Sequence, residues 1–298
     1  MFEGFESRTL HTAGGGQIFA RVGGSGPPLL LLHGYPQSHV MWHAVAPLLA
    51  RSFTVVATDL TGYGKSHRPA AAPDHAPHSK RQMAVEQVDA MRGLGFEDFS
   101  VAGHDRGGRC AYRMALDHPQ RVRRLAVLDI IPTAEVLARV DGAVATGYWH
   151  WFFLAQPAPL PEALILGDPD AFFSGGGALG LGGQSPPAAM ESYRRALKDP
   201  DSVHAMCEDY RAGATIDREH DEADRGRRRI GCPLLTLWGA QGRLGEWYDV
   251  PAIWRDWADD VSGGPIDASH FLAEERPREV GRELEAFFRG EPEPTGLE

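Results

Sequence analysis

One stretch, residues 100–110 (SVAGHDRGGRC), constrains the fold of this chain more than any other. An apolar run at 99–102 is typical of a buried strand, and a helical pattern begins at Gly107. Between them lies Gly-His-Asp-Arg-Gly, the spacing of a nucleophile elbow with Asp105 at its tip. Glycines suit such a turn, because strain and close helix–strand packing leave no space for Cβ atoms. Alone, the pentapeptide fits a helix-capping aspartate almost equally well.

An aspartate at this tip changes the chemistry that the turn can perform. A serine needs a base to remove its proton before it attacks an acyl carbon. A carboxylate can attack a tetrahedral carbon directly, which gives an ester that water must hydrolyse. The positive end of the following helix helps to keep Asp105 ionised.

Size and composition narrow the possibilities. The 298 residues are 43% hydrophobic and 23% charged, as in an ordinary globular protein. A net charge of −10 gives no basic footprint, so we expect no nucleic-acid partner. No apolar run has membrane-spanning length and no signal segment opens the chain, so we expect no membrane partner. The three scattered cysteines predict reduced thiols in the cytoplasm, without a disulfide frame or a metal site.

Strand and helix patterns alternate, which predicts an α/β fold with a doubly wound, mostly parallel sheet. The predicted strands are 6–13, 17–22, 28–32, 53–57, 99–102, 124–131, 232–239 and 264–268. The predicted helices are 39–50, 79–94 (capped by Ser79), one from Gly107, 251–258 and 277–288. Ligands bind such sheets at the carboxyl ends of the strands.

Residues 133–225 interrupt this alternation with helical patterns, a proline-rich piece at 156–161 and a glycine-rich piece at 174–184. We therefore predict an inserted helical cap at 133–225, with the core formed by 1–132 and 226–298. Residues 291–298 are expected to form a frayed tail.

His270 follows the last predicted strand, and Asp129 ends the strand after the elbow. The chain order nucleophile, acid, histidine is that of α/β-hydrolases. Asp129 would fix the tautomer of His270, which would deprotonate water. Asp267 and Asp249 are weaker candidates for the acid. His270 could instead be a surface residue and Asp129 a turn cap.

Backbone and arginine side chains could complete the site. The N–H groups of Tyr35 and Arg106 could form an oxyanion hole, with the Tyr35 ring in the pocket. Arg106 and Arg109 lie three apart where a helix begins, so both could clamp a substrate carboxylate. Alternatively, they bind core carboxylates. Arg113 continues the series but is expected to face a surface acid.

The predicted cap contains a dense group of ring donors at 148–151 (Tyr-Trp-His-Trp), and Tyr210 follows later. His150, Trp151 and Tyr210 could converge on a leaving anion, although aromatic stripes more often pack a core. Each charge-assisted hydrogen bond would supply roughly 1.5–3 kcal/mol.

Taken together, four features resemble the fluoroacetate dehalogenases, which are haloacetate dehalogenases of the α/β-hydrolase superfamily. They are the segment 104–109 (HDRGGR), the triad order, YWHW at 148–151 followed by LAQPAPLP at 154–161, and MCEDYRAG at 206–213. The likeness covers nearly the whole chain. Epoxide hydrolases and haloalkane dehalogenases share the aspartate elbow, but they usually have tryptophan where this chain has Arg106.

The resemblance implies that Asp105 attacks the α-carbon of a small 2-haloacid and expels halide. His270, oriented by Asp129, then activates water to hydrolyse the ester. Arg106 and Arg109 would hold the carboxylate, and the three cap donors the halide. The products would be a 2-hydroxy acid and halide. The resemblance implies no metal and no organic cofactor, and commonly a homodimer.

One departure concerns the glycine-rich segment 174–184, where the family carries a further pocket tryptophan. Glycine, alanine, leucine and serine here predict a looser pocket, which weakens the expectation of fluoride and could admit larger haloacids. Two alternatives stay open: an epoxide hydrolase with the same Asp105 nucleophile, and a non-catalytic receptor for small carboxylates.

Overall fold

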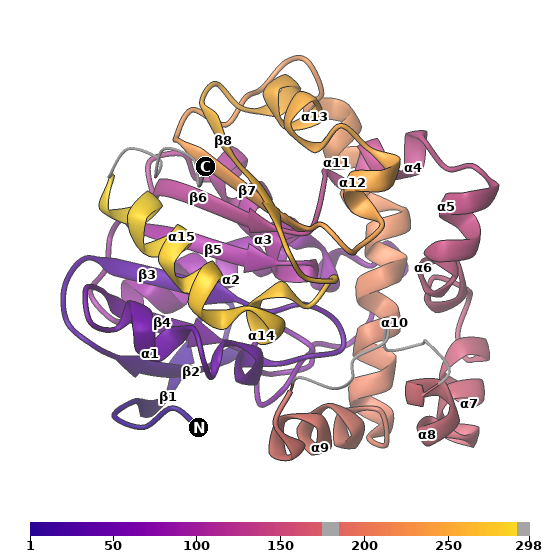
Figure 1. Ribbon diagram of the computed structural model, residues 1–298. Helices are drawn as coiled ribbons and strands as arrows, with labels where there is room; N and C mark the ends of the chain where they lie inside the picture. The colour runs from indigo at the N-terminus through magenta and orange to yellow at the C-terminus, as the bar shows by residue number, and fades with distance from the viewer. Residues whose placement is uncertain (175–184, 291–298) are drawn as a thin grey trace.

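A computed structural model of the chain describes residues 1–174 and 185–290. Its centre is an eight-stranded sheet of order β1-β2-β4-β3-β5-β6-β7-β8 (Figure 1). The strands are β1 (Glu6–His11), β2 (Gln17–Gly23), β3 (Pro28–Leu32), β4 (Thr54–Thr58), β5 (Phe99–His104), β6 (Val122–Leu128), β7 (Leu234–Gly239) and β8 (Val261–Ile266). Strand β2 pairs antiparallel with both β1 and β4, and all the pairs from β4 to β8 are parallel. The predicted doubly wound, mostly parallel sheet is confirmed.

The apolar run of β3 shows why the sheet is covered on both faces. Successive side chains of a strand point to opposite sides. Leu30 and Leu32 belong to one buried cluster, and Leu29 and Leu31 belong to another. The first cluster lies under α2 (Lys80–Gly93), α3 (Arg106–Asp117) and α13 (Val250–Trp257). The second lies under η1 (His39–Trp42), α1 (Ala46–Leu49), α14 (Leu272–Glu275) and α15 (Pro277–Arg289).

Two helix predictions had different outcomes. Ser79 caps α2 as predicted, because its side chain accepts a hydrogen bond from the amide of Gln82. The single helix predicted at 39–50 is wrong: a 3₁₀ turn, η1, is followed by the separate short helix α1. Pro47 lies in the first turn of α1, the one place where its missing N–H is tolerated, so the helix restarts there.

Between β6 and β7, the described residues form helices and no strand (Figure 1). They are α4 (Thr133–Ala138), α5 (Gly142–Gly147), α6 (Trp149–Leu154), α7 (Leu160–Gly167), α8 (Pro169–Phe172), α9 (Pro187–Ala196), α10 (Pro200–Ala214) and α11 (Ile216–Asp224). Helix α10 runs between the sheet and the outer helices α5–α8 (Figure 1). The division into core and cap at 132/133 and 225/226 stays a prediction.

Two further short helices complete the described elements: η2 (Ala76–His78) and α12 (Leu244–Trp247). Two expectations lie outside the described residues: the looser pocket predicted from 174–184, of which 175–184 are not described, and the tail at 291–298. Among the described helices, none combines the length and the apolar character that crossing a membrane requires.

Candidate active site

Asp105 occupies a strained turn between β5 and α3. Its backbone has φ +47° and ψ −114°, a conformation that non-glycine residues rarely adopt. A Cβ at Gly103 would lie 2.3 Å from the carbonyl oxygen of Gly107, and one at Gly107 would lie 2.4 Å from that of His33. Both glycines are therefore needed for the close approach of helix and strands. The order of the sheet reverses between β3 and β5, so the turn lies where open α/β sheets bind ligands.

The Asp105 carboxylate is buried and faces positive charge. The backbone N–H of Tyr35 donates to its Oδ1 over 2.8 Å. Burial raises the pKa of Asp105, but the nearby histidine rings and the guanidinium groups of Arg106 and Arg109 outweigh it, so the pKa lies below its usual value. The carboxylate is therefore ionised at neutral pH, as a nucleophile must be. The Tyr35 amide, predicted for the oxyanion hole, contacts this carboxylate directly.

His270 is oriented by Asp129. Its Nδ1 lies 2.5 Å from Asp129 Oδ2, and Asp129 Oδ1 accepts from the N–H of Gly239 over 2.9 Å. Burial lowers the pKa of His270, but the hydrogen bond and charge of Asp129 and the charge of Asp105 outweigh it, so the pKa is raised. The Nε2 of His270 is buried and has no hydrogen-bond partner among the described residues.

The weaker candidates for the acid lie elsewhere. Asp267 is exposed and accepts from the side chains of Gln241 and Arg276. Asp249 caps α13 by accepting from the amide of Ala252. Of the three predicted carboxylates, Asp129 is the one that contacts His270.

A cavity of about 350 Å³ joins these residues to the predicted cap. Its core wall includes Asp105, Arg109, Asp129 and His270, and its cap wall is formed by residues 146–151. This volume lies at the lower end of the range for small-molecule sites. The structure thus brings the elbow aspartate, one predicted arginine and two predicted cap donors, His150 and Trp151, to one cavity.

The two predicted arginines have different surroundings. Arg106 is paired with buried Asp209: its Nε lies 2.9 Å from Oδ2, and its Nη2 lies 2.7 Å from Oδ1. Arg109 makes no ion pair within the described residues. Its Nη1 donates to the carbonyl of Ile131 and to Oγ1 of Thr133, both over 3.0 Å. Arg109 therefore brings an unneutralised charge to the cavity, whereas the charge of Arg106 is largely balanced.

Asp209 was missed by the sequence analysis. Besides Arg106, it accepts from the phenol of Tyr63 over 2.7 Å and pairs with Lys80. Burial raises its pKa, but the charges of Arg106 and Lys80 bring the pKa well below the usual value. The one sequence signal was its position beside Tyr210, in a segment already assigned to the site.

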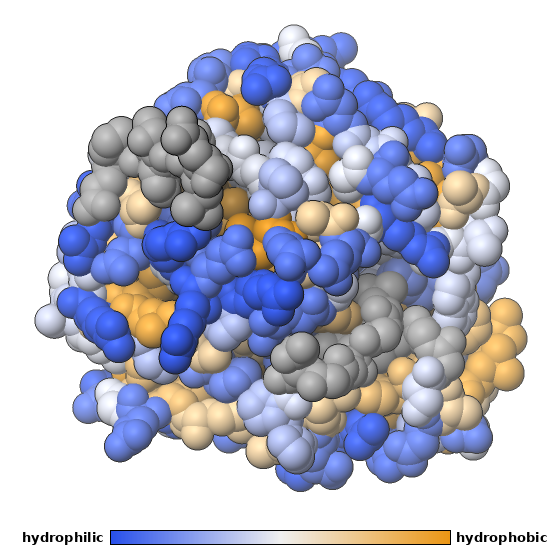
Figure 2. Space-filling model, viewed as in Figure 1, coloured by the Kyte–Doolittle hydropathy of each residue, from blue (hydrophilic) through white to orange (hydrophobic). Residues whose placement is uncertain are grey.

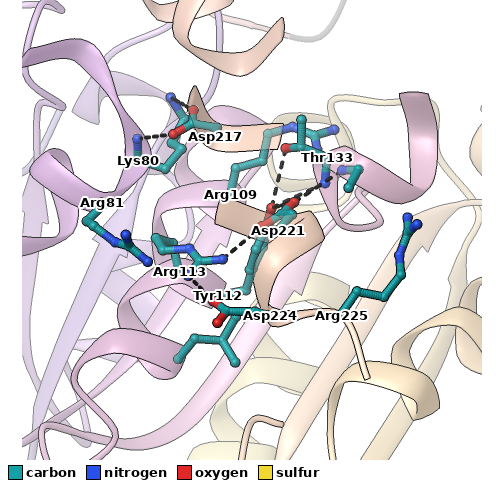
Figure 3. A network of polar contacts seen from close by, with 12 residues as sticks. Lys80, Arg81, Arg109, Tyr112, Arg113, Thr133, Asp217, Asp221, Asp224 and Arg225 are labelled. Carbon is teal, nitrogen blue, oxygen red and sulfur yellow. Dashed lines mark hydrogen bonds and ion pairs between the residues drawn. The ribbon is translucent and has the colours of Figure 1, made fainter. Parts of the chain in front are cut away.

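The expectation that Arg113 faces a surface acid is wrong. Arg113 is buried rather than at the surface, and it pairs with Asp221 over 2.9 Å and with Asp224 over 2.5 Å (Figure 3). Both acids lie on α11, so α3 connects to this last helix before β7 through buried charges.

The predicted cap donors lie together beside Tyr35. The His150 ring is fully buried and lies 5.9 Å from that of Tyr210, which lies 6.2 Å from that of Trp151. Burial lowers the pKa of His150 to about 3, so the ring is neutral. Neither ring nitrogen of His150, nor the Tyr210 hydroxyl, has a partner among the described residues. Buried polar groups normally do, so these groups suit a ligand.

Within residues 1–174 and 185–290, no three or more histidine, cysteine, aspartate or glutamate side chains are grouped to hold a metal ion.

Comparisons with known proteins identify the family of this chain. The family model for the alpha/beta hydrolase fold matches residues 27–277. A fluoroacetate dehalogenase from Burkholderia sp is 49% identical over 97% of this chain and 95% of its own length. The chain belongs to the haloacetate dehalogenase family of α/β-hydrolases.

Other relatives of this family member include a soluble epoxide hydrolase from Corynebacterium sp. (strain C12), 34% identical over 89% of this chain and 91% of its own length. The crystal structure of a putative alpha/beta hydrolase from Nostoc sp PCC 7120 has a TM-score of 0.93 and 51% identity, covering 97% of this chain and 99% of that one. A mutant of a putative epoxide hydrolase from Pseudomonas aeruginosa, described with bound MFA, has a TM-score of 0.88 and 46% identity, covering 96% of both chains. These likenesses confirm the α/β-hydrolase fold and support a hydrolase at family level.

Proposed function

We propose that this protein hydrolyses small 2-haloacids, such as haloacetates, to 2-hydroxy acids and halide. The observation that carries the proposal is the pairing of an ionised nucleophile with an unneutralised guanidinium. Asp105 and Arg109 line the same cavity, and Arg109 has no acid partner among the described residues. A carboxylate substrate would supply the missing countercharge while its α-carbon faces Asp105.

In the first step, an oxygen of Asp105 attacks the α-carbon and displaces halide, which leaves with the bonding electron pair. Unpartnered donors of His150 and Tyr210, together with the indole N–H of Trp151, would receive the halide. Arg109 would hold the substrate carboxylate, joined by Arg106 through the N–H groups that Asp209 does not occupy. The product of this step is an ester on Asp105.

In the second step, Nε2 of His270 removes a proton from water, and the hydroxide attacks the ester carbonyl of Asp105. The amides of Tyr35 and Arg106 would stabilise the resulting oxyanion. The intermediate collapses, and protonated His270 returns the proton to the departing hydroxy acid. Loss of the remaining proton to solvent restores the Asp105 carboxylate. Asp129 stabilises the imidazolium that forms between these two transfers.

The decisive measurement is halide release from fluoro-, chloro- and bromoacetate and from 2-halopropionates. We expect chloride and bromide release, and slower fluoride release, because the sequence at 174–184 lacks the further tryptophan that the family carries there. A chain that releases no halide from any of these acids would refute the proposal.

Two further experiments test the covalent intermediate. A single turnover in ¹⁸O-labelled water should place the label in Asp105 rather than in the product. In the His270→Ala variant the ester should accumulate, so mass spectrometry with bromoacetate should show an adduct. Label found only in the product would instead favour direct attack by water, and an unmodified mass would remove His270 from the role of base.

Epoxide hydrolysis is the second candidate, favoured by the 34% identical Corynebacterium relative and by the position of Tyr148 in the cavity wall. A cap tyrosine would have to protonate the opening epoxide, and the free charge of Arg109 would have no role. Formation of diol from styrene oxide, without bromide release from bromoacetate, would decide for this activity. Carboxylate binding without any turnover would decide for a receptor.

We also propose that the enzyme is a cytoplasmic homodimer. Exposed apolar side chains on α6 and α7 support an interface there: Trp149, Phe152, Leu160 and Leu164. Figure 2 shows hydrophobic residues gathered at this edge of the molecule. Light scattering should give twice the chain mass, and Leu164→Glu should shift it towards the monomer. The free thiols of all three cysteines suit a reducing compartment.

A further inference from the structure

Arg109 is held in place by neutral oxygens. Its Nη1 donates to the carbonyl of Ile131 and to the hydroxyl oxygen of Thr133, where β6 passes into α4. Its guanidinium also lies over the ring of Trp151, 4.5 Å from the ring centre. None of these contacts neutralises the charge, so the geometry of Arg109 is fixed while its charge stays available.

The Thr133 hydroxyl belongs to a longer chain of hydrogen bonds (Figure 3). The phenol oxygen of Tyr112 lies 3.3 Å from Thr133 Oγ1 and 2.7 Å from Asp221 Oδ2. The backbone N–H of Thr133 also donates to this phenol oxygen, over 3.2 Å. All three side chains are buried.

The number of protons on these groups decides which group donates in each hydrogen bond. The phenol of Tyr112 has one proton, and the short contact with a carboxylate is the stronger bond. That proton therefore goes to Asp221, and the Thr133 hydroxyl must donate to Tyr112. The Thr133 lone pairs are then left to accept from Arg109. The donors run in one direction: Arg109 to Thr133, Thr133 to Tyr112, and Tyr112 to Asp221.

Asp221 is itself fixed at the end of this chain. Arg113 contacts its Oδ1 over 2.9 Å, and the N–H of Ala134 donates to its Oδ2 over 3.1 Å. The acid therefore orients the chain without contacting Arg109. An acid in direct contact with Arg109 would compete with the substrate carboxylate for the same N–H groups.

We propose that Thr133, Tyr112 and Asp221 are positioning residues that aim the free N–H groups of Arg109 at the substrate carboxylate. This inference rests on the proposed function. It explains why α11, which has no residue in the wall of the cavity, carries a buried acid directed at α3 and at the start of α4.

The test uses Thr133→Val and Tyr112→Phe, which remove one hydroxyl each and keep the shape of the side chain. We expect KM for chloroacetate to rise about tenfold with kcat changed less than threefold, because an interaction equal in the ground and transition states acts on KM. Thr133→Ser keeps the hydroxyl, so its KM should stay close to that of the wild type. Thr215→Val is the matched control, since Thr215 is exposed and its hydroxyl donates to the Arg211 carbonyl instead.

Calorimetric titration with glycolate supplies a readout that does not depend on turnover. Its binding should weaken about tenfold in Thr133→Val and Tyr112→Phe. Equal KM and glycolate affinity in wild type and both variants would overturn the positioning role and leave the proposed function intact. An equal loss of kcat and stability in the serine and valine variants would show a structural role only. A wild-type protein that neither releases halide nor binds glycolate would remove the proposed function and this inference with it.

Discussion

The two arginines beside the nucleophile differ in how their charge is balanced, which separates their expected effects. Replacing Arg109 by Met removes the unneutralised cation, so KM for haloacids should rise roughly 100-fold or more. Replacing Arg106 by Met leaves buried Asp209 with Lys80 as its remaining cation. The free energy of unfolding should then fall by about 3 kcal/mol. Kinetics and urea denaturation of both variants check this, and a larger stability loss for Arg109→Met would contradict it.

The pH dependence of the reaction depends on the bond between His270 and Asp129. His270 must be neutral to accept a proton, so kcat/KM should fall as the pH drops through its pKa. That pKa is raised, so the acidic limb should lie above pH 6.5, the usual value for histidine. In Asp129→Asn the charge is lost, the limb should move to lower pH, and kcat should fall roughly 10³-fold or more.

Asp267→Asn is the control for this pH profile, because exposed Asp267 does not contact His270. Its acidic limb should match that of the wild type. A limb that moves with Asp267 and not with Asp129 would reassign the acid.

At the level of residues, the sequence was informative where local geometry determines chemistry. Gly103 and Gly107 indicated the elbow, because their spacing reflects contacts that the backbone itself makes. The partner of Arg106 could not be found this way, since Asp209 lies 103 positions away and is brought close by the packing of α10 on the core. For the same reason Arg113 was expected at the surface.

Helices α3 and α11 are joined by buried charge. Arg113 pairs with both Asp221 and Asp224. Asp224 also pairs with the half-exposed Arg228. Replacing Arg113 by Met would leave buried carboxylates without their main partner. The free energy of unfolding should fall by about 3–5 kcal/mol.

The matched control is Arg218→Met, on the outer side of α11, where the pair with Glu222 is exposed. It should cost less than about 1 kcal/mol. Equal losses in the two variants, measured by chemical denaturation, would argue against a buried lock between these helices.

At the level of elements, periodicity predicted the parallel strands well, because strands buried on both faces must be continuously apolar. Periodicity failed where tertiary contacts decide at which residue a strand or helix begins and ends. The strand predicted at 264–268 is Val261–Ile266, at the sheet edge, where glycines and a proline mask the pattern. A single helix was predicted at 39–50 because the apolar period continues through Pro47. The structure has two separate elements there, since the proline ring prevents a continuous helix.

For the whole molecule, burial of neutral histidines predicts sensitivity to mild acid. Burial lowers the pKa of His78 and of His104 to about 4 and that of His150 to about 3. Between about pH 6.5 and pH 4 the unfolded chain binds protons at these positions and the folded chain does not. Stability should therefore fall with falling pH, by up to about 1.4 kcal/mol per pH unit for each ring.

His78 offers the cleanest test of this linkage, because neither of its ring nitrogens has a partner among the described residues and it lies outside the cavity wall. His78→Phe keeps an aromatic ring and removes the titrating group. The slope of unfolding free energy against pH, measured between pH 5.5 and pH 4.5, should decrease by about 1.4 kcal/mol per pH unit. Above pH 7.5 the ring is neutral in both states, so the curves of variant and wild type should run parallel there. Parallel curves over the whole range would contradict the prediction, because they would mean that His78 has the same pKa in the folded and in the unfolded chain.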